Sequence, residues 1–260
     1  MTMAEVLHSI NGHVATITLR NENRYNAMSI AMWLQLGTTL AALNADTNVR
    51  AVVLRGDGDK AFASGADISE FGEKRNDPAS VAAYDAAVAN AQAALAGFRC
   101  PVIAAISGIC YGGGLGLVLA CDLRYASPTA KFRMPAARLG LGYAYGGMKR
   151  MVAVLGVAKA SEVFYTANVY TAGDALRIGL VAGLHDDVFA VASETAAMIA
   201  SNAPLTIRAA KLAFNALLAG GEPADVTAVD TAVKACFKSE DYAEGRAAFA
   251  DKRAPQFKGR

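Results

Sequence analysis

Long apolar segments are missing from this chain of 260 residues, although 54% of its residues are hydrophobic. No stretch approaches the roughly 18 uninterrupted apolar residues that a membrane-spanning helix needs, so no association with a membrane is expected. Residues 1–5 show no basic segment followed by an apolar core, which predicts that there is no signal peptide. We therefore expect a cytoplasmic protein.

Residue types that commonly bind metals are also sparse. The chain has three histidines and four cysteines. Cys100, Cys110, Cys121 and Cys236 show no C-x-x-C spacing and none lies near a histidine, so they are interpreted as buried free thiols and no metal site is expected. The net charge is only +2 and the basic residues are scattered, which argues against nucleic-acid binding.

Several common catalytic motifs are missing as well. The glycines around Gly112 do not form G-x-G-x-x-G, and no G-x-x-x-x-G-K-[ST] follows a predicted strand, so dinucleotide-binding and P-loop motifs are absent. Neither Ser64 nor Ser107 lies in a G-x-S-x-G motif. The three histidines are interpreted as surface residues, and a serine triad is therefore poorly supported.

What the chain does contain is a succession of strand, turn and helix patterns up to about residue 190, followed by a helical stretch. The length allows one large domain with a smaller appendage. We predict a core over residues 1–195 and a helical region over residues 196–260. The high alanine and apolar content indicates close helix packing and an oligomer whose interfaces cover apolar surface.

Local patterns predict individual elements. Alternating polar and apolar residues around Asn11-Gly12 predict a β-hairpin over residues 5–19. Ser29 is predicted to cap a helix that reaches about Asn44. The remaining predicted elements before residue 187 are a helix at 80–97 and strands at 51–55, 101–106, 123–126, 131–134 and 180–184.

The most informative segment runs from Pro101 to Asp122. A buried strand leads into three consecutive glycines at 112–114, and an apolar helix is predicted to start at Leu115. Free backbone N–H groups at a helix start can hold negative charge, but this helix carries no acid or base. A second glycine-containing turn, over residues 61–68, also follows a strand and precedes a predicted helix.

Together the two turns resemble the oxyanion-hole signature of the enoyl-CoA hydratase/isomerase (crotonase) superfamily. The resemblance covers nearly the whole chain. It is carried by five segments in the family's order, at residues 23–28, 63–68, 108–122, 132–150 and 239–253. Each segment is weak evidence by itself, whereas five in the right order are strong evidence.

The resemblance implies an α/β fold: a crotonase-like spiral of strand–strand–helix repeats with a C-terminal helical trimerisation region. It implies a homotrimer or a dimer of trimers that binds an acyl-CoA thioester. Coenzyme A would enter as part of the substrate, and no separate cofactor is expected. Acyl-CoA chemistry of this kind belongs to fatty acid metabolism.

The resemblance also assigns roles to residues. The backbone N–H groups of Ala66 and Gly113 would bind the thioester carbonyl oxygen, onto which the reaction drives negative charge. Asp67 is interpreted as a helix cap in preference to a base. Contacts with coenzyme A are implied for residues of the early loop, the first half of the oxyanion hole and the C-terminal helix: Arg24, Tyr25, Ala27, Ala63, Asp67, Ile68, Phe249 and Lys252.

One departure from the family concerns its acids. Hydratases of this family use two glutamates that flank a water molecule, and the matching positions here are Gly116 and Ala136. Neither residue can carry a proton. Tyr143 falls where the methylmalonyl-CoA decarboxylase branch also has a tyrosine, although that branch has a histidine at the position of Ala66. Tyr143, with a reference pKa of about 10, is interpreted either as a proton or hydrogen-bond donor or as a packing residue.

Other polar residues near the predicted site have two interpretations each. Arg138 either recognises a second carboxylate on the substrate or forms a surface salt bridge. Glu73, Tyr84 and Asp85 either supply an alternative acid or form the polar surface of a helix.

Three hypotheses follow from these observations. The first is an acyl-CoA enzyme of this family, an isomerase or lyase, that stabilises a thioester enolate with an atypical acid–base set. The second is a decarboxylase-like C–C lyase acting on a malonyl-type thioester. The third is a non-catalytic acyl-CoA binding protein. The particular acyl group and the choice between trimer and hexamer cannot be read from the sequence.

Overall fold

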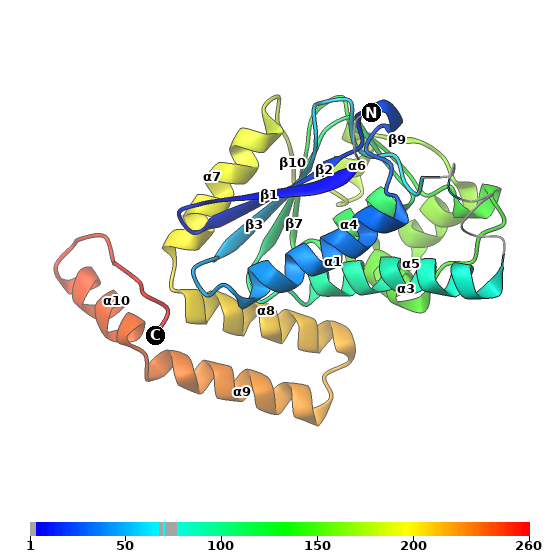
Figure 1. Ribbon diagram of the computed structural model, residues 1–260. Helices are drawn as coiled ribbons and strands as arrows, with labels where there is room; N and C mark the ends of the chain where they lie inside the picture. Colours follow the sequence, from blue (N-terminus) through cyan, green and yellow to red (C-terminus); the bar gives the residue numbers. More distant parts are fainter. Residues whose placement is uncertain (1–3, 68–69, 71–76) are drawn as a thin grey trace.

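A computed structural model describes residues 4–67, 70 and 77–260 of the chain (Figure 1). Its largest sheet, within those residues, has the order β1-β2-β3-β5-β7-β10. β1 and β2 form the predicted antiparallel hairpin, and every later pair in this sheet is parallel. The bounds are β1 Glu5–Asn11, β2 Val14–Arg20, β3 Ala51–Gly56, β5 Val102–Ile106, β7 Leu123–Ala126 and β10 Gly183–Leu184.

A second sheet of shorter strands has the order β4-β6-β8-β9. In three successive repeats, a strand of the first sheet continues after a short corner into a strand of the second: β3 into β4, β5 into β6, and β7 into β8. This repetition gives the strand–strand–helix spiral that the sequence predicted. The bounds are β4 Ala61–Ala63, β6 Ile109–Tyr111, β8 Lys131–Arg133 and β9 Tyr170–Thr171.

Helices follow the strand pairs and cover the sheets. As predicted, Ser29 caps the first helix, its side chain accepting a hydrogen bond from Met32 N–H. The long helix Tyr145–Thr166 is interrupted at Gly156, whose φ of 70° is not helical. The elements are η1 Glu22–Arg24, α1 Ile30–Ala45, α3 Pro78–Ala96, α4 Gly113–Ala120, η3 Ala136–Arg138, α5 Tyr145–Thr166 and α6 Ala172–Arg177.

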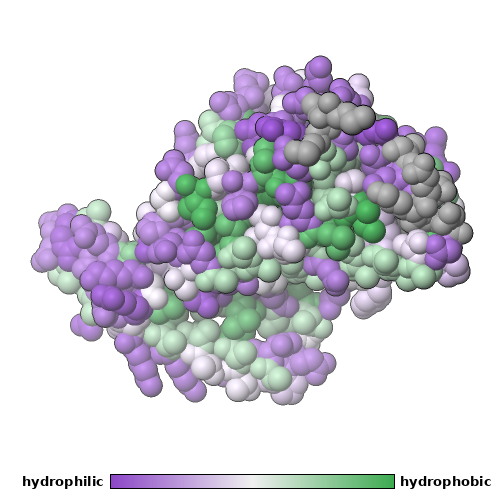
Figure 2. Space-filling view, viewed as in Figure 1, coloured by the Kyte–Doolittle hydropathy of each residue, from purple (hydrophilic) through white to green (hydrophobic). Residues whose placement is uncertain are grey.

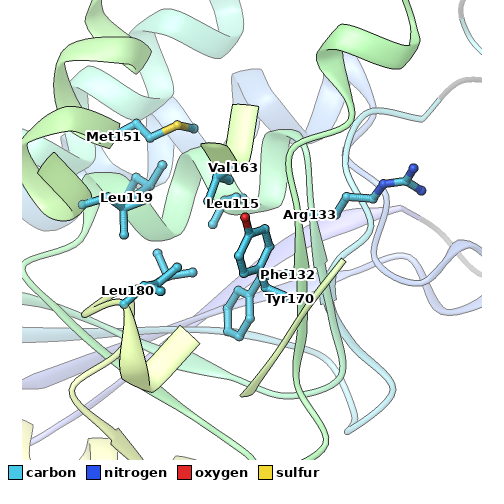
Figure 3. Close-up of a pocket in the computed structure, with 10 residues that line it drawn as sticks. Leu115, Leu119, Phe132, Arg133, Met151, Val163, Tyr170 and Leu180 are labelled. Atoms are coloured by element: carbon cyan, nitrogen blue, oxygen red, sulfur yellow. The ribbon is translucent and has the colours of Figure 1, made fainter. Parts of the chain in front are cut away.

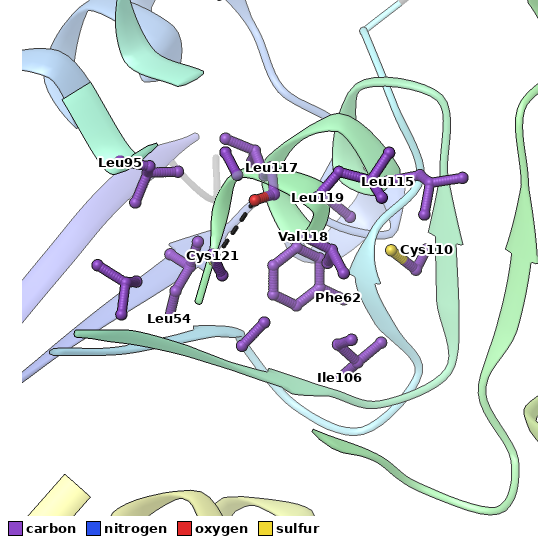
Figure 4. Packing of buried hydrophobic residues seen from close by; sticks show 14 of the residues in the cluster. Leu54, Phe62, Leu95, Ile106, Cys110, Leu115, Leu117, Val118, Leu119 and Cys121 are labelled. Atoms are coloured by element: carbon purple, nitrogen blue, oxygen red, sulfur yellow. Dashed lines mark hydrogen bonds between the residues drawn. The ribbon is translucent and has the colours of Figure 1, made fainter. Parts of the chain in front are cut away.

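The main hydrophobic core lies where α1, α3 and α4 pack against the sheets (Figure 4). Leu54 and Ile106 of the first sheet meet Phe62 of β4 and the apolar residues of α4 there. All five residues of β5 are buried, because a central parallel strand is covered on both faces. The core therefore holds α4, and with it the glycine run, in a fixed place.

The opposite face of the first sheet is covered by α7, Val188–Ser201. Alternate strand residues turn to this side, since successive side chains of a strand point to opposite faces. Ala51, Val53 and Ile103 pack there against the small residues Ala192 and Ala196. The division predicted at residue 195 lies inside α7, which is part of the layer over the sheet.

Three more helices complete the chain: α8 Pro204–Ala219, α9 Pro223–Phe237 and α10 Glu240–Ala250. Figure 1 shows α8 and α9 as a hairpin below the sheet, with α10 beyond them. Figure 2 shows mainly hydrophilic residues over α10 on this face and paler, more apolar residues over α8 and α9. Lys211 anchors α8 to the core, because its buried Nζ donates to Asp122 Oδ2 at 2.7 Å and to Cys100 O at 2.9 Å.

Several predicted bounds need correction. The helix predicted from Ser80 begins at Pro78, because Asp77 caps it and proline suits the first helical position. The helix predicted from Leu115 begins at Gly113. The strand predicted at 180–184 is reduced to Gly183–Leu184. None of the described helices is both long and apolar enough to span a bilayer.

Candidate active site

The loop around Ala66 is fixed by the early loop at residues 24–28. Met28 N–H donates to Gly65 O at 2.8 Å, and Asp67 N–H donates to Met28 O at 3.0 Å. A salt bridge of 3.0 Å joins Arg24 Nη1 to Asp67 Oδ1, with the Asp67 residue only 8% exposed. Backbone and side-chain bonds thus hold the two loops together on both sides of Ala66.

The glycine run lies directly beside this loop. Gly112 adopts φ 49° and ψ −112°, a conformation open to glycine, and its N–H donates to Arg133 O at 2.9 Å. Gly113 is then the first residue of α4. A Cβ placed on Gly113 would lie 3.8 Å from Ala66 N, and one placed on Gly65 would lie 3.8 Å from Gly113 N. The two backbone nitrogens therefore border one small space.

The N–H groups of Ala66 and Gly113 both lack a hydrogen-bond acceptor within the described parts of the chain. Most backbone donors in a folded protein are paired, so two neighbouring free donors are informative. Trp33 packs under them, since its Cζ2 would be 3.1 Å from a Cβ on Gly113. Trp33 is itself buried and donates from Nε1 to the Tyr84 hydroxyl at 3.2 Å. The space thus has two N–H donors and an aromatic wall.

One turn further along α4, the surface of Gly116 is covered by two polar groups. A Cβ on Gly116 would lie 2.4 Å from Gln92 Nε2 and 2.9 Å from the Tyr143 hydroxyl oxygen. Gln92 comes from α3 and is 4% exposed. Its Oε1 accepts a hydrogen bond of 2.9 Å from Nη2 of Arg150 on α5. Any side chain at position 116 would collide with this arrangement.

The Tyr143 ring contacts Phe164 edge to face, with centroids 5.8 Å apart. Burial raises the pKa of Tyr143 to about 12, although the charge of Arg150 and a hydrogen bond from Gln92 act in the opposite direction. Burial lowers the pKa of Arg150, and the neighbouring Tyr143 opposes that change. Tyr143 is therefore a protonated phenol at neutral pH.

The far side of α4 is apolar and closely packed (Figure 3). Leu115 and Leu119 of α4 face Met151 and Val163 of α5 around a cavity of about 10 Å³, roughly the space of one water molecule. This packing fixes the position of α4 between α5 and the core.

A model of the enoyl-CoA hydratase/isomerase family matches residues 9–260. The chain is 32% identical to 2,3-dehydroadipyl-CoA hydratase of Escherichia coli, over 99% of this chain and all of that one. The chain belongs to the enoyl-CoA hydratase/isomerase family.

Other family members agree over the full length. The chain is 31% identical to the short-chain-enoyl-CoA hydratase of Clostridium acetobutylicum, with 97% of each chain covered. The crystal structure of the enoyl-CoA hydratase from Bacillus anthracis superposes with a TM-score of 0.92 at 32% identity, covering 98% of this chain and 99% of that one. The predicted crotonase-like fold is thereby confirmed.

Most residues to which the family resemblance assigns a role lie together. Arg24, Tyr25 and Ala27 belong to the early loop, and Ala63 and Asp67 flank Ala66. Ile68 lies outside the described residues. Within one chain, Phe249 and Lys252 do not join this group, because α10 lies beyond α8 and α9 (Figure 1) and Phe249 is 88% exposed.

The other polar candidates are distributed differently. Tyr84 is buried under Trp33, whereas Asp85 and Arg138 are exposed on α3 and η3. Glu73 lies outside the described residues.

Sequence reasoning missed Gln92 and Arg150. A signal for Gln92 was present, because it follows Tyr84, Ala87 and Ala91 on the buried face of α3. A single amide in such an apolar stripe needs a buried partner. No comparable pattern distinguishes Arg150, since its partner lies on another helix.

Proposed function

We propose that this family member acts on an acyl-CoA thioester and stabilises its enolate through the backbone N–H groups of Ala66 and Gly113. The observation that carries the proposal is that these two neighbouring donors have no acceptor in the described parts of the chain. Fixed donors aimed at a developing oxyanion contribute roughly 2.7–4 kcal/mol each in protease precedents. The buried Trp33 ring beside the donors lowers the local polarity, which strengthens such electrostatic interactions.

Proton transfer in this proposal falls to Tyr143. The family resemblance puts glutamates at the positions of Gly116 and Ala136, and neither residue here can carry a proton. The Tyr143 hydroxyl lies beside Gly116 instead. Because its pKa is raised to about 12, Tyr143 acts as an acid and donor at neutral pH, not as a base.

Because neither Gly116 nor Ala136 can act as a base, a second candidate is a decarboxylase-like lyase acting on a malonyl-type thioester. Loss of CO2 forms the enolate directly, so the reaction needs the two N–H donors and an acid but no base. Hydration or isomerisation of an enoyl thioester requires an additional base. The third hypothesis is a non-catalytic thioester-binding protein, in which Tyr143 has no chemical role.

The rest of the substrate would be held by the early loop and by the C-terminal region. In this proposal Arg24 meets a phosphate of coenzyme A, with Tyr25, Ala27, Ala63, Asp67 and Ile68 lining its path. Phe249 and Lys252 join the site only from another copy of the chain. The exposed apolar side chains Phe214, Leu217 and Phe237 on α8 and α9 support a homotrimer or a dimer of trimers, since exposed apolar clusters commonly form interfaces.

The decisive experiment measures α-proton exchange of a saturated acyl-CoA in D2O, together with turnover of enoyl- and malonyl-type thioesters. Exchange or turnover of any thioester supports an enzyme, and the thioester that reacts identifies the reaction. If the protein binds thioesters without exchanging their α-protons or turning them over, only the hypothesis of a binding protein remains. Loss of both activities and of binding contradicts the proposal.

A matched pair of variants tests the two donors. Gly113→Ala places a methyl group 3.8 Å from Ala66 N and 3.1 Å from Trp33, so we expect it to obstruct the carbonyl oxygen and lower the exchange rate at least tenfold. Gly142→Ala is the control, because no atom lies within 4 Å of the added methyl. Equal rates for both variants would contradict the assigned place of the oxyanion.

A further inference from the structure

Gln92 has a polar neighbour on each side of its amide, on an otherwise apolar face of α3. Its Oε1 faces Arg150 and its Nε2 faces Gly116 and the Tyr143 hydroxyl. The three side chains come from α3, the loop before α5, and α5 itself. They form one cluster of polar groups beside Gly116, one helical turn from Gly113.

Arg150 sets the orientation of the Gln92 amide. A guanidinium only donates, so the atom of Gln92 that faces Arg150 must be the amide oxygen. The amide nitrogen, which also only donates, is thereby turned to Tyr143. Gln92 thereby offers a donor on the side of the Tyr143 oxygen, and a Tyr143 that accepts from it must point its own O–H proton elsewhere.

We propose that Gln92, oriented by Arg150, donates to the Tyr143 oxygen and so acts as a positioning residue that directs the O–H of Tyr143 toward the substrate. The inference rests on the proposed function for its chemical step. In that step the proton leaves the Tyr143 oxygen and forms a C–H bond at the α-carbon of the enolate, while the enolate electrons restore the thioester carbonyl. Water then returns a proton to the tyrosinate.

Charge also favours this arrangement. The tyrosinate formed in the step is stabilised by the N–H of Gln92 and by the positive charge of Arg150, both of which act to lower the pKa of Tyr143. Arg150 Nε is buried and has no hydrogen-bond partner within the described residues. A partly buried and incompletely paired cation gains from a negative charge that develops nearby.

The test is Gln92→Glu, which keeps the shape and the acceptor for Arg150 but replaces the donor with a second acceptor. The Tyr143 hydroxyl should then donate to the carboxylate and turn away from the substrate. We expect kcat to fall about 100-fold, the lower end of the range for general acids, with KM changed less than threefold. The Raman doublet of Tyr143, isolated by subtracting the spectrum of Tyr143→Phe, reports the hydrogen bonding of its hydroxyl. Its intensity ratio should change from that of an accepting hydroxyl to that of a donating one.

Gln35→Glu is the matched control. The amide oxygen of Gln35 accepts from Val6 N–H at 2.8 Å, and its amide nitrogen donates to Val6 O at 3.0 Å. Gln35 lies on α1, away from Tyr143. It should leave kcat and the Raman difference unchanged. If Gln92→Glu does not fold, Arg150→Met replaces it, because the amide is then free to turn.

The outcomes separate this inference from the proposed function. An active wild-type enzyme whose Gln92→Glu variant keeps both kcat and the Raman signature contradicts the positioning role alone. A wild-type protein that processes no thioester contradicts the proposed function. Even then the Raman signal of Tyr143 tests the inference. An unchanged signal in Gln92→Glu overturns the inference, and a changed signal supports the assigned bond directions.

Discussion

The two sides of the candidate site differ in what they are made of. The backbone side, residues 65–66 and 112–113, uses main-chain N–H groups on two loops that follow strands. The side-chain side, formed by Gln92, Tyr143 and Arg150, uses polar groups contributed by α3, α5 and the loop before α5. The first side depends on where the chain turns and the second on which side chains meet.

This difference determines how each side can change. A backbone donor does not depend on residue type as long as the turn persists, so the loops can serve any reaction that passes through an enolate. The side-chain side is specific, since one altered group changes which proton is available. We therefore expect the backbone side to determine the kind of intermediate and the side-chain side to determine the reaction.

The largest expected effect is on the side-chain side. Tyr143→Phe removes the acid but keeps the ring and its contact with Phe164. We expect kcat for the reactive thioester to fall 10²- to 10⁴-fold, the usual contribution of a general acid, with little change in thioester binding. Steady-state kinetics check this, with exposed Tyr165→Phe as control. If Tyr143→Phe kept the kcat of the wild type, Tyr143 would be a packing residue and not an acid.

On the backbone side, the largest effect is expected from Gly114→Ala. The added methyl would lie 2.3 Å from Ala63 O and 2.9 Å from Ala63 Cβ, and main-chain atoms cannot turn aside as a side chain can. We expect a loss of about 3 kcal/mol in the free energy of unfolding, because α4 must move away from β4. Denaturant unfolding measures it. Gly146→Ala, with no atom within 4 Å, should change stability by less than 1 kcal/mol.

The same contrast explains how much the sequence predicted. The hairpin at Asn11-Gly12, the cap at Ser29 and the strands before both glycine turns follow from local patterns, and the structure confirms them. The backbone side could be proposed from the sequence because each half is a continuous stretch with its own signature. Two-residue strands such as β9 have no such pattern, since pairing with β8 alone defines them.

The side-chain side could be predicted only in part. Tyr143 was identified through its place in a family loop, whereas Gln92 and Arg150 are 58 residues apart and meet only in the folded chain. Nothing in the neighbourhood of either residue indicates the other. Phe249 shows the same limit, because the role proposed for it requires a second copy of the chain.

A smaller effect, on stability, follows from the pKa of Tyr143. Its folded-state pKa of about 12 exceeds the unfolded value of about 10. The phenol therefore contributes stability that is fully present below pH 10 and is lost as the pH rises toward 12. Between pH 9 and 11 the wild type should lose about 1 kcal/mol more than Tyr143→Phe. Unfolding curves at several pH values give this difference, and parallel curves for the two proteins would contradict the burial of the hydroxyl.

The smallest effect is expected at Asp67, on the backbone side. Asp67→Asn removes the charge that pairs with Arg24, whose side chain is 50% exposed, so we expect a loss of only about 1 kcal/mol. Because Asp67 is interpreted as holding its loop and not as a base, kcat should stay within threefold of the wild type. Asp57→Asn, which loses a 2.7 Å pair with Arg20 away from the site, is the control for stability. A fall in kcat beyond 100-fold in Asp67→Asn alone would make Asp67 a base, and the backbone side would then supply proton transfer as well as charge stabilisation.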